Sequence, residues 1–176
     1  MRYLRSKEKE LIKGCLSNDR FAQKRLYDLY KDAMFTLAFR ILRDNDLACD
    51  ALQDGFIDVF MNLGKFEGKS TLGAWIKTII VRKCLRKLKK ENRYETINED
   101  MEEKTYSWDE NLTGELLDKA INGLSAGYRS VFILVEIEGY SHKEVARLLN
   151  ISEGTSKSQL SRAKQQLQKM LKHLKN

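Results

Sequence analysis

Apolar residues recur along most of the chain at intervals of three and four positions, the spacing of one face of an α-helix. The segments that follow this pattern are 7–16, 20–42, 46–63, about 71–92, 114–124, 125–138, 141–150 and 152–168. Alternating apolar and polar runs, which would indicate strands, are nearly absent, and the chain has no proline. The sequence therefore predicts an all-α protein.

Segment 20–42 is the longest of these helices, and a turn and N-cap cluster at residues 17–19 precedes it. Its apolar positions, which predict the buried face, are Phe21, Leu26, Leu29, Tyr30, Phe35 (or Met34), Leu37, Ala38 and Ile41. The polar residues 43–46 end the segment.

Residues 141–168 form two short helical segments joined by a tight turn. Ser141 and Glu144 have the spacing of a capping box, Asn150 tolerates the left-handed conformation that ends a helix, and Ser152 can cap the next helix. This is the pattern of a helix-turn-helix, whose second helix enters the major groove of DNA. An ordinary helical hairpin is the alternative, although it rarely has so one-sided a polar and basic face. The candidate DNA contacts are Thr155, Lys157, Ser158, Ser161, Arg162 and Gln165.

Segment 46–63 combines an apolar face with an aspartate at every fourth position, namely Asp46, Asp50, Asp54 and Asp58. Like charges at this spacing destabilise a helix by roughly 0.2–0.5 kcal/mol per pair. The pattern fits a solvated acidic face or a docking face for a basic partner. It fits a carboxylate metal site poorly, because the Glu-x-x-His ligand pattern is missing. The docking candidates are Asp50, Gln53, Asp54 and Ile57.

A glycine-bounded loop at residues 64–70 precedes a helix that begins after Ser70 or Thr71 and is rich in lysine and arginine. An aromatic residue beside positive charge is what single-stranded nucleic acid binding requires, because bases stack and phosphates are neutralised. A solvated lysine face is the alternative. Trp75 lies on the apolar side, so core packing is the favoured role for it. The candidate strand-binding residues are Lys65, Phe66, Lys69, Lys77, Arg82, Lys83 and Arg86.

Residues 91–112 carry eight acidic and two basic side chains and no apolar periodicity, which is typical of a linker. We therefore expect two small helical domains, residues 1–92 and 113–176, joined by an acidic linker at 93–112.

The composition narrows the possible functions. A net charge of +7 favours a polyanionic partner. The three cysteines are widely spaced without a CxxC pair, which argues against disulfides and a zinc site and suggests small core residues. No clustered His/Cys/carboxylate site indicates an enzyme, a metal or a cofactor. No apolar run approaches the roughly 18 residues of a membrane span, and the N-terminus lacks a signal-peptide core, so we expect a cytoplasmic protein without membrane insertion.

Together these motifs resemble bacterial RNA polymerase sigma factors of the extracytoplasmic-function (ECF) subfamily, over about residues 7–172. The resemblance rests on Gln53-Asp54, Phe66, Gly68 and Trp75-Ile76 in the first half, and on Tyr128-Arg129, Glu144-Val145-Ala146, Gly154-Thr155 and Arg162-Ala163 in the second. No single motif is decisive. Their order, with a Trp-bearing basic helix, an acidic linker and a terminal helix-turn-helix, is specific.

The resemblance implies a role for each part of the chain. The acidic helix would bind the coiled coil of the largest subunit of core RNA polymerase. The loop and basic helix would recognise and open the minus-ten region of promoter DNA, and the linker would run near the polymerase active site. The helix-turn-helix would read the minus-thirty-five element, and an anti-sigma factor is a further implied partner.

Several positions depart from the family pattern. Ser125-Ala126 follows Leu124 where a proline is usual, and Ser156 replaces a valine, which predicts weaker helix packing. Gln159 stands where arginine is common, and Arg82 and Arg86 replace an asparagine and an aspartate. These changes leave the promoter sequence open. The alternative function is a two-domain helix-turn-helix regulator that binds duplex DNA without polymerase.

Overall fold

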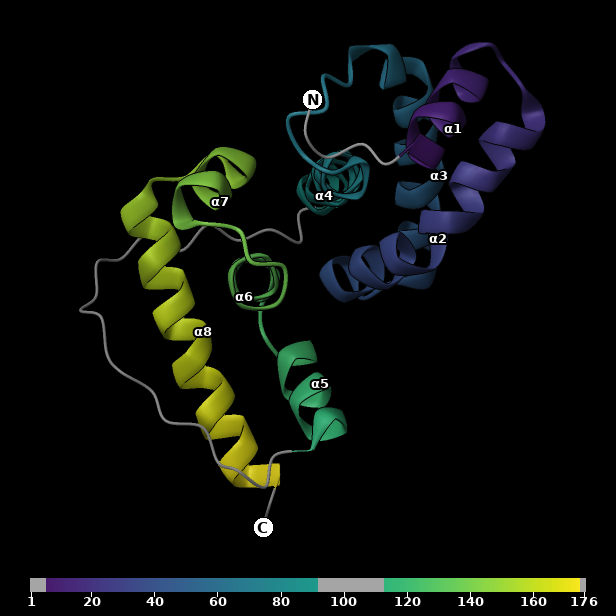
Figure 1. Cartoon of the computed structure of the whole chain (residues 1–176). Coiled ribbons are helices and arrows are strands. Elements are labelled where there is room, and N and C mark those ends of the chain that lie inside the picture. The colour runs from purple at the N-terminus through teal and green to yellow at the C-terminus, as the bar shows by residue number, and fades with distance from the viewer. Residues whose placement is uncertain (1–5, 92–112, 175–176) are drawn as a thin grey trace. The chain divides into compact units, whose positions relative to one another are not determined.

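The computed structural model describes residues 6–91 and 113–174, and within these ranges every regular element is a helix (Figure 1). This confirms the all-α prediction. Contacts divide the chain into two compact units, Met1–Lys87 and Leu88–Asn176. The expected linker at 93–112 lies outside the described residues, and the three-part division of the chain stays a prediction.

The first unit contains α1 (Ser6–Leu16), α2 (Arg20–Leu42), α3 (Asn45–Asn62), the 3₁₀ turn η1 (Leu63–Lys65) and most of α4 (Leu72–Lys90). Helix α2 packs along α3, and α1 packs on α2 and η1. The side chain of Asp19 accepts a hydrogen bond from the Phe21 amide and caps α2, while Asp44 caps α3 through the Leu47 amide. The starts of α2 and α3 are therefore set by local signals that the sequence carries.

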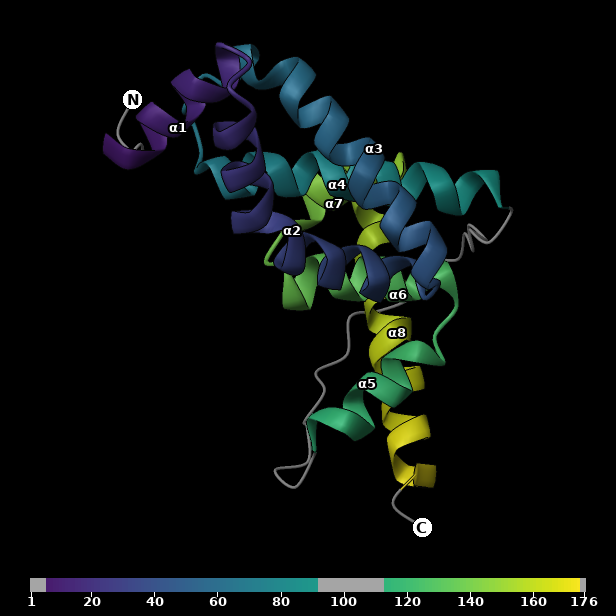
Figure 2. The same cartoon turned by 90° about the vertical axis from the view of Figure 1, so that its right-hand side faces the viewer.

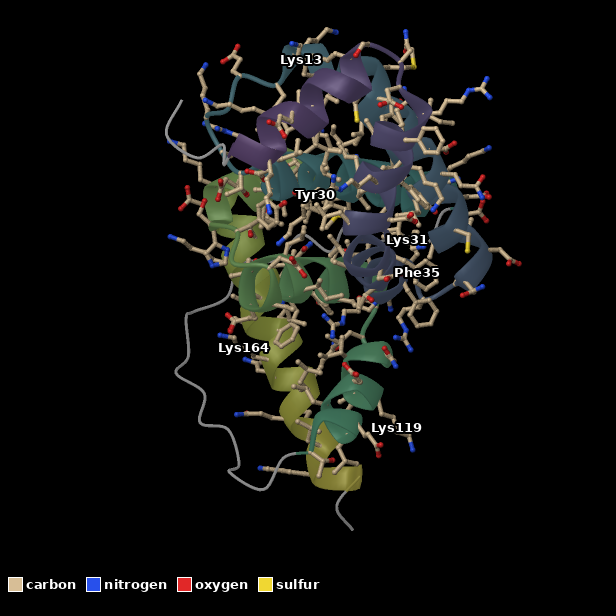
Figure 3. The ribbon with its side chains drawn as sticks, turned by 45° about the vertical axis from the view of Figure 1, so that its right-hand side comes forward. Lys13, Tyr30, Lys31, Phe35, Lys119 and Lys164 are labelled. Carbon is tan, nitrogen blue, oxygen red and sulfur yellow. The ribbon has the colours of Figure 1, made fainter. Side chains whose placement is uncertain are left out.

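Helices α3 and α4 cross (Figure 2), and Gly55 of α3 lies against Ile80 of α4. A Cβ atom at Gly55 would collide with Cδ1 of Ile80, whose side chain is fully buried. Farther along α4, Gly73 lies against the Tyr30 ring of α2, the residue labelled in Figure 3. Glycine at these two positions lets α4 approach the α2–α3 pair closely.

We expect Gly55→Ala to destabilise the first unit by about 1–3 kcal/mol, because overpacking forces the two helices apart. Ile80→Val removes the atom with which the new methyl group collides, and by itself costs about 0.5–1.5 kcal/mol. The loss in the free energy of unfolding of the double variant should therefore be smaller than the sum of the losses of the two single variants. Urea denaturation of the full chain measures all three, and strict additivity would contradict this crossing geometry.

Two apolar residues of α2 lie outside the core, contrary to the sequence prediction. Phe21 is 86% and Leu29 is 62% exposed, whereas Leu26, Leu37 and Ile41 are buried. At about 100° per residue, Phe21 lies about 140° around the helix from Leu26. The apolar positions of segment 20–42 are thus spread more widely than the single face that α3 covers.

The second unit contains α5 (Gly114–Asn122), α6 (Ala126–Phe132), the π-helical turn η2 (Ile133–Ile137), α7 (His142–Leu149) and α8 (Glu153–Leu174). Helices α5, α6 and α7 each contact α8, which runs the length of the unit (Figure 1). The buried side of α8 presents Leu160, Ala163, Leu167 and Leu171. Lys164, labelled in Figure 3, forms an ion pair of 2.9 Å with Glu136 of η2.

The turn between α5 and α6 is held by a buried arginine. The 125–138 segment was expected to begin with a cap from Ser125, but the Ser125 side chain makes no capping hydrogen bond, so that expectation is wrong. Instead, Nη1 of Arg129 donates a hydrogen bond of 2.8 Å to the carbonyl oxygen of Leu124. Hydrogen bonds from charged groups are worth more than neutral ones. Arg129 therefore fixes the turn where the family pattern has a proline.

Two of the cysteines serve as core residues, as the sequence indicated. Cys15 and Cys84 are buried, Cys49 is half-buried, and all three are free thiols. Burial raises the pKa of Cys84 to about 12, so that its reactive thiolate does not form near neutral pH. Burial and the charge of Asp19 also raise the pKa of Cys15.

Candidate nucleic-acid interface and docking surface

The first helix of the helix-turn-helix begins with the predicted capping box. The hydroxyl of Ser141 accepts a hydrogen bond from the Glu144 amide, and the Glu144 carboxylate accepts one of 2.9 Å from the Ser141 amide. Hydrogen bonds from the side chain and backbone of Ser141 lower the pKa of Glu144. The cap is therefore complete at neutral pH and weakens only as acidification protonates Glu144.

The turn between α7 and α8 also has the geometry that the sequence predicted. Asn150 adopts the left-handed conformation, with φ of 57° and ψ of 50°, and Ile151 is half-buried. The Ser152 hydroxyl accepts a hydrogen bond of 2.9 Å from the Thr155 amide and so caps α8. These local signals define the path of the chain from α7 into the recognition helix α8.

A hydrogen bond across the motif joins α7 and α8 at Ser156, and the expectation of weaker helix packing there stays a prediction. The hydroxyl of Ser156 is fully buried and lies 2.9 Å from Nδ1 of His142, at the start of α7. A buried hydroxyl needs such a partner, which valine at this position would not. His142 and Ser156 thus tie the first turns of α7 and α8 together.

The predicted DNA contacts differ in exposure. Lys157 is exposed and forms an ion pair of 3.5 Å with Glu153. Thr155, Arg162 and Gln165 are half-buried, and the Thr155 hydroxyl lies 2.8 Å from that of Ser152 in the cap. Ser158 and Ser161 are only 6% and 5% exposed. In this conformation Lys157 is therefore the most accessible member of the set, and the roles of all six stay predictions.

Gln159 is a residue of α8 that the sequence interpretation left out of the contact set. It is 1% exposed, and neither atom of its amide group has a hydrogen-bond partner among the residues that the structure describes. Leaving such a group unpaired costs free energy. The burial of Gln159 depends on packing between helices, which the sequence pattern does not reveal. The one sequence signal at this position was that glutamine stands where the family commonly has arginine.

The loop before α4 is ordered by contacts with its neighbours. The rings of Phe66 and Trp75 lie 5.4 Å apart between centroids, with Phe66 half-buried. Lys65 donates a hydrogen bond of 2.9 Å to Asn62, and Lys69 forms an ion pair with Glu67. The side chain of Thr71, one of the two residues after which the helix was expected to begin, accepts a hydrogen bond of 3.2 Å from the Ala74 amide and so caps α4. Two exposed lysines therefore flank an aromatic pair.

The proposed docking residues form one exposed surface on α3. Asp50, Gln53 and Asp54 are exposed, and Ile57 is 57% exposed although it is apolar. We call these four residues the docking stripe. An exposed apolar side chain among acidic ones suits a partner whose surface has an apolar patch surrounded by basic side chains.

Ion pairs between α3 and α4 join the acidic helix to the basic one. Nζ of Lys83 lies 2.7 Å from Oδ2 of Asp58, and Nζ of Lys87 lies 3.4 Å from Oδ2 of both Asp50 and Asp54. We call these five residues the ion-pair ladder. The sequence analysis assigned Lys83 to strand binding, whereas here it is directed at α3. The basic face of α4 is consequently divided into lysines that contact α3 and residues that face solvent.

The solvent-facing part of α4 retains strong positive charge. Arg82, Arg86, Lys89 and Lys90 are exposed, and Lys77 is half-buried. Arg86 also lies 3.9 Å from Asp58, at the edge of the ladder. Within the first unit, Lys77, Arg82 and Arg86 of α4 and Lys65 and Lys69 of the loop supply the positive charge that binding a phosphate backbone beside an aromatic pair requires.

Other kinds of site find no support in residues 6–91 and 113–174. No group of three or more His, Cys, Asp or Glu side chains in these ranges can hold a metal ion. None of the helices described there is both long and apolar enough to span a membrane.

Comparison with known proteins agrees with the two-part organisation. Residues 26–94 match the model for sigma-70 region 2, and residues 114–167 match that for sigma-70 region 4. Together the matched ranges take in more than half of the chain. The first contains the docking stripe, the loop and α4, and the second contains the helix-turn-helix.

Individual relatives cover nearly the whole chain. The ECF RNA polymerase sigma factor SigM of Mycobacterium tuberculosis is 29% identical over 94% of this chain and 85% of its own length. SigW of Bacillus subtilis, also an ECF sigma factor, is 25% identical over 94% of this chain and 97% of its own.

Solved structures give the same result. The sigma factor RpoE in its complex with the anti-sigma factor NepR from Bartonella quintana is 29% identical, with a TM-score of 0.55 over 85% of this chain and 96% of that one. CnrH in complex with the cytosolic domain of CnrY has a TM-score of 0.56 at 21% identity, over 93% and 96% of the two chains, and supports the fold alone. The chain belongs to the ECF group of RNA polymerase sigma factors.

Proposed function

We propose that this chain binds core RNA polymerase through the docking stripe and directs the polymerase to promoter DNA, which it reads and opens. The loop and the solvent-facing part of α4 act on the minus-ten region, and α8 acts on the minus-thirty-five element. The chain itself catalyses no reaction and works in the cytoplasm, where polymerase and chromosome meet. The residue assignments within each surface belong to this proposal.

The docking stripe is the observation that carries the proposal. A helix-turn-helix regulator that acts alone needs a DNA-binding surface but no exposed acidic and apolar surface on another helix. The stripe lies within the range that matches sigma-70 region 2. A basic coiled coil is a suitable partner, because acidic groups around Ile57 provide charge complementarity and an apolar contact.

An anti-sigma factor is a further proposed partner. The sigma factor RpoE, which has a similar fold, is known in a complex with the anti-sigma factor NepR, and CnrH, also of similar fold, in one with the cytosolic domain of CnrY. By analogy, a protein that covers the docking stripe or α8 of this chain would prevent transcription.

A DNA-binding experiment with three samples distinguishes a sigma factor from a two-domain regulator that binds DNA without polymerase. Labelled duplex promoter fragments are incubated with the chain alone, with core polymerase alone, and with both. We expect sequence-specific binding only when both are present. Tight, specific binding by the chain alone, unaffected by polymerase, would support the two-domain regulator instead.

Arg162 provides a test of readout by the recognition helix. Arginine can bridge the edge of a guanine or hold a phosphate. We expect Arg162→Ala to cost about 1–3 kcal/mol on a cognate promoter and much less on an unrelated fragment, if the side chain reads a base. Holoenzyme binding titrations on both fragments measure this. An equal loss on both, with a shallower salt dependence, would make Arg162 a phosphate contact.

A further inference from the structure

Gln159 of the recognition helix α8 carries a hydrogen-bond donor and an acceptor that the protein itself does not use. The residue is 1% exposed, and neither Nε2 nor Oε1 of its amide has a hydrogen-bond partner among the residues that the structure describes. Buried polar side chains are nearly always paired in folded proteins, and an unpaired one is destabilising. A methionine would fill similar space without that cost. A partner outside the chain therefore explains the amide better than packing does.

Gln159 lies at the border between the core side of α8 and the side that carries the candidate DNA contacts. Helix geometry places it beside Thr155, four positions before it, and Arg162, three positions after it, and both of these candidates are half-buried. On its other flank lie Ser156 and Ala163, which are fully buried. A change of side-chain rotamer can therefore turn the Gln159 amide from the core side toward a bound DNA groove.

The turn of α8 around Gln159 must become accessible before it can read DNA. Ser158 and Ser161, two of the candidate contacts, are only 6% and 5% exposed. A base cannot reach their hydroxyl groups in this conformation, so readout through this turn requires a change that uncovers it. Because Gln159 lies between these two serines in the sequence, the same change brings its amide within reach of DNA.

We infer that Gln159 reads an adenine in the minus-thirty-five element and so specifies one base pair of the promoter. This inference deepens the proposed function and rests on it. In the major groove adenine presents the acceptor N7 beside the donor N6, which is the complement of the donor and the acceptor of the Gln159 amide. Guanine presents two acceptors there and cytosine a single donor, so neither satisfies both amide groups.

The unpaired amide makes the choice of base matter for affinity. An exposed side chain exchanges hydrogen bonds with water for hydrogen bonds with a base, which limits its net gain. The Gln159 amide gives up no protein partner among the described residues and has little contact with water. Opposite any base except adenine, at least one of its two groups stays unpaired. We expect adenine to be preferred at this position by about 5- to 150-fold, which corresponds to the roughly 1–3 kcal/mol of a bidentate contact.

The test selects promoter sequences with the assembled holoenzyme. Core polymerase and the full-length chain are incubated with duplex fragments randomised over the minus-thirty-five element, and the bound fragments are sequenced. Gln159→Met removes both hydrogen-bonding groups from an unbranched side chain, and Gln159→Arg supplies the side chain that pairs with guanine. We expect Gln159→Met to reduce the adenine preference at one position by about fivefold or more. Gln159→Arg should change the preferred base at that same position to guanine.

Gln166→Met is the matched control, because it makes the same change two turns farther along the same side of α8 and outside the candidate contacts. It should keep the wild-type base preferences. Thermal denaturation of the free chains accompanies the selection. We expect Gln159→Met to be at least as stable as the wild type, since it removes an unpaired buried amide.

The possible outcomes separate base reading from a structural role of Gln159. Base preferences that are identical in the wild type, Gln159→Met and Gln159→Arg would overturn the inference. So would a loss of stability in Gln159→Met with an equal loss of affinity for all sequences. If Gln159→Met does not fold, Gln159→Arg decides alone, because arginine is common at this position in the family. A wild-type holoenzyme that selects no upstream element would instead count against the proposed function.

Discussion

Asp54→Lys should weaken assembly with core RNA polymerase by about 10- to 100-fold while the fold is retained. Asp54 is 52% exposed in the centre of the docking stripe, so its replacement alters the surface more than the core. The change places a cation against a basic partner, and juxtaposed like charges cost several kcal/mol at an interface. Loss of one of the two aspartates near Lys87 adds a smaller cost to stability, because Asp50 remains as its partner.

The measurement is a titration of core polymerase with the labelled chain, accompanied by thermal denaturation of the variant. Asp32→Lys is the matched control, because it makes the same charge change at an exposed position of α2 outside the stripe. We expect the control to bind nearly as well as the wild type. If Asp54→Lys binds core polymerase with wild-type affinity, the docking stripe is not the surface that binds core polymerase.

Replacement of residues 66–69 by Gly-Ser-Gly-Ser should abolish transcription from duplex promoters but reduce it much less on templates already opened at the minus-ten region. A sigma factor has no energy source for melting, so it must capture bases that leave the stack transiently. Unstacking costs a few kcal/mol, and stacking on an aromatic ring returns about 1–3 kcal/mol per base. The replacement removes Phe66, Lys69 and the ion pair with Glu67.

Two further variants separate the possible roles of the loop. Phe66→Ala removes the ring but also its packing on Trp75, whereas Lys69→Ala leaves that aromatic pair intact. Permanganate reactivity of unpaired thymines reports strand opening directly. Equal loss of activity on duplex and pre-opened templates, with assembly unharmed, would show that the loop has a role other than capturing a melted base.

The helix-turn-helix could be predicted in detail because its determinants are local. Ser141 and Glu144, Asn150, and Ser152 each act on backbone groups within a few positions of themselves, so their spacing in the sequence is also their geometry. The structure confirms each of these interactions. The long helices were predictable for a similar reason, and α2 begins at Arg20 and ends at Leu42 as expected.

Properties that depend on packing between helices could not be predicted in this way. Lys83 and Arg82 are adjacent basic residues, yet Lys83 pairs with Asp58 of α3 and Arg82 faces solvent. The register of α4 on α3, set by the contact of Gly55 with Ile80, decides between them. The same limit applies to Phe21, whose apolar character suggested burial although its side chain is 86% exposed.

Run-off transcription tests the central claim most directly. Core polymerase is supplied with genomic fragments, with and without the chain, and the transcripts are sequenced. We predict discrete transcripts that start at a small set of sites only when the chain is present, and that share sequence elements near minus ten and minus thirty-five. Identical transcripts with and without the chain, when the chain is folded and bound to polymerase, would contradict the account.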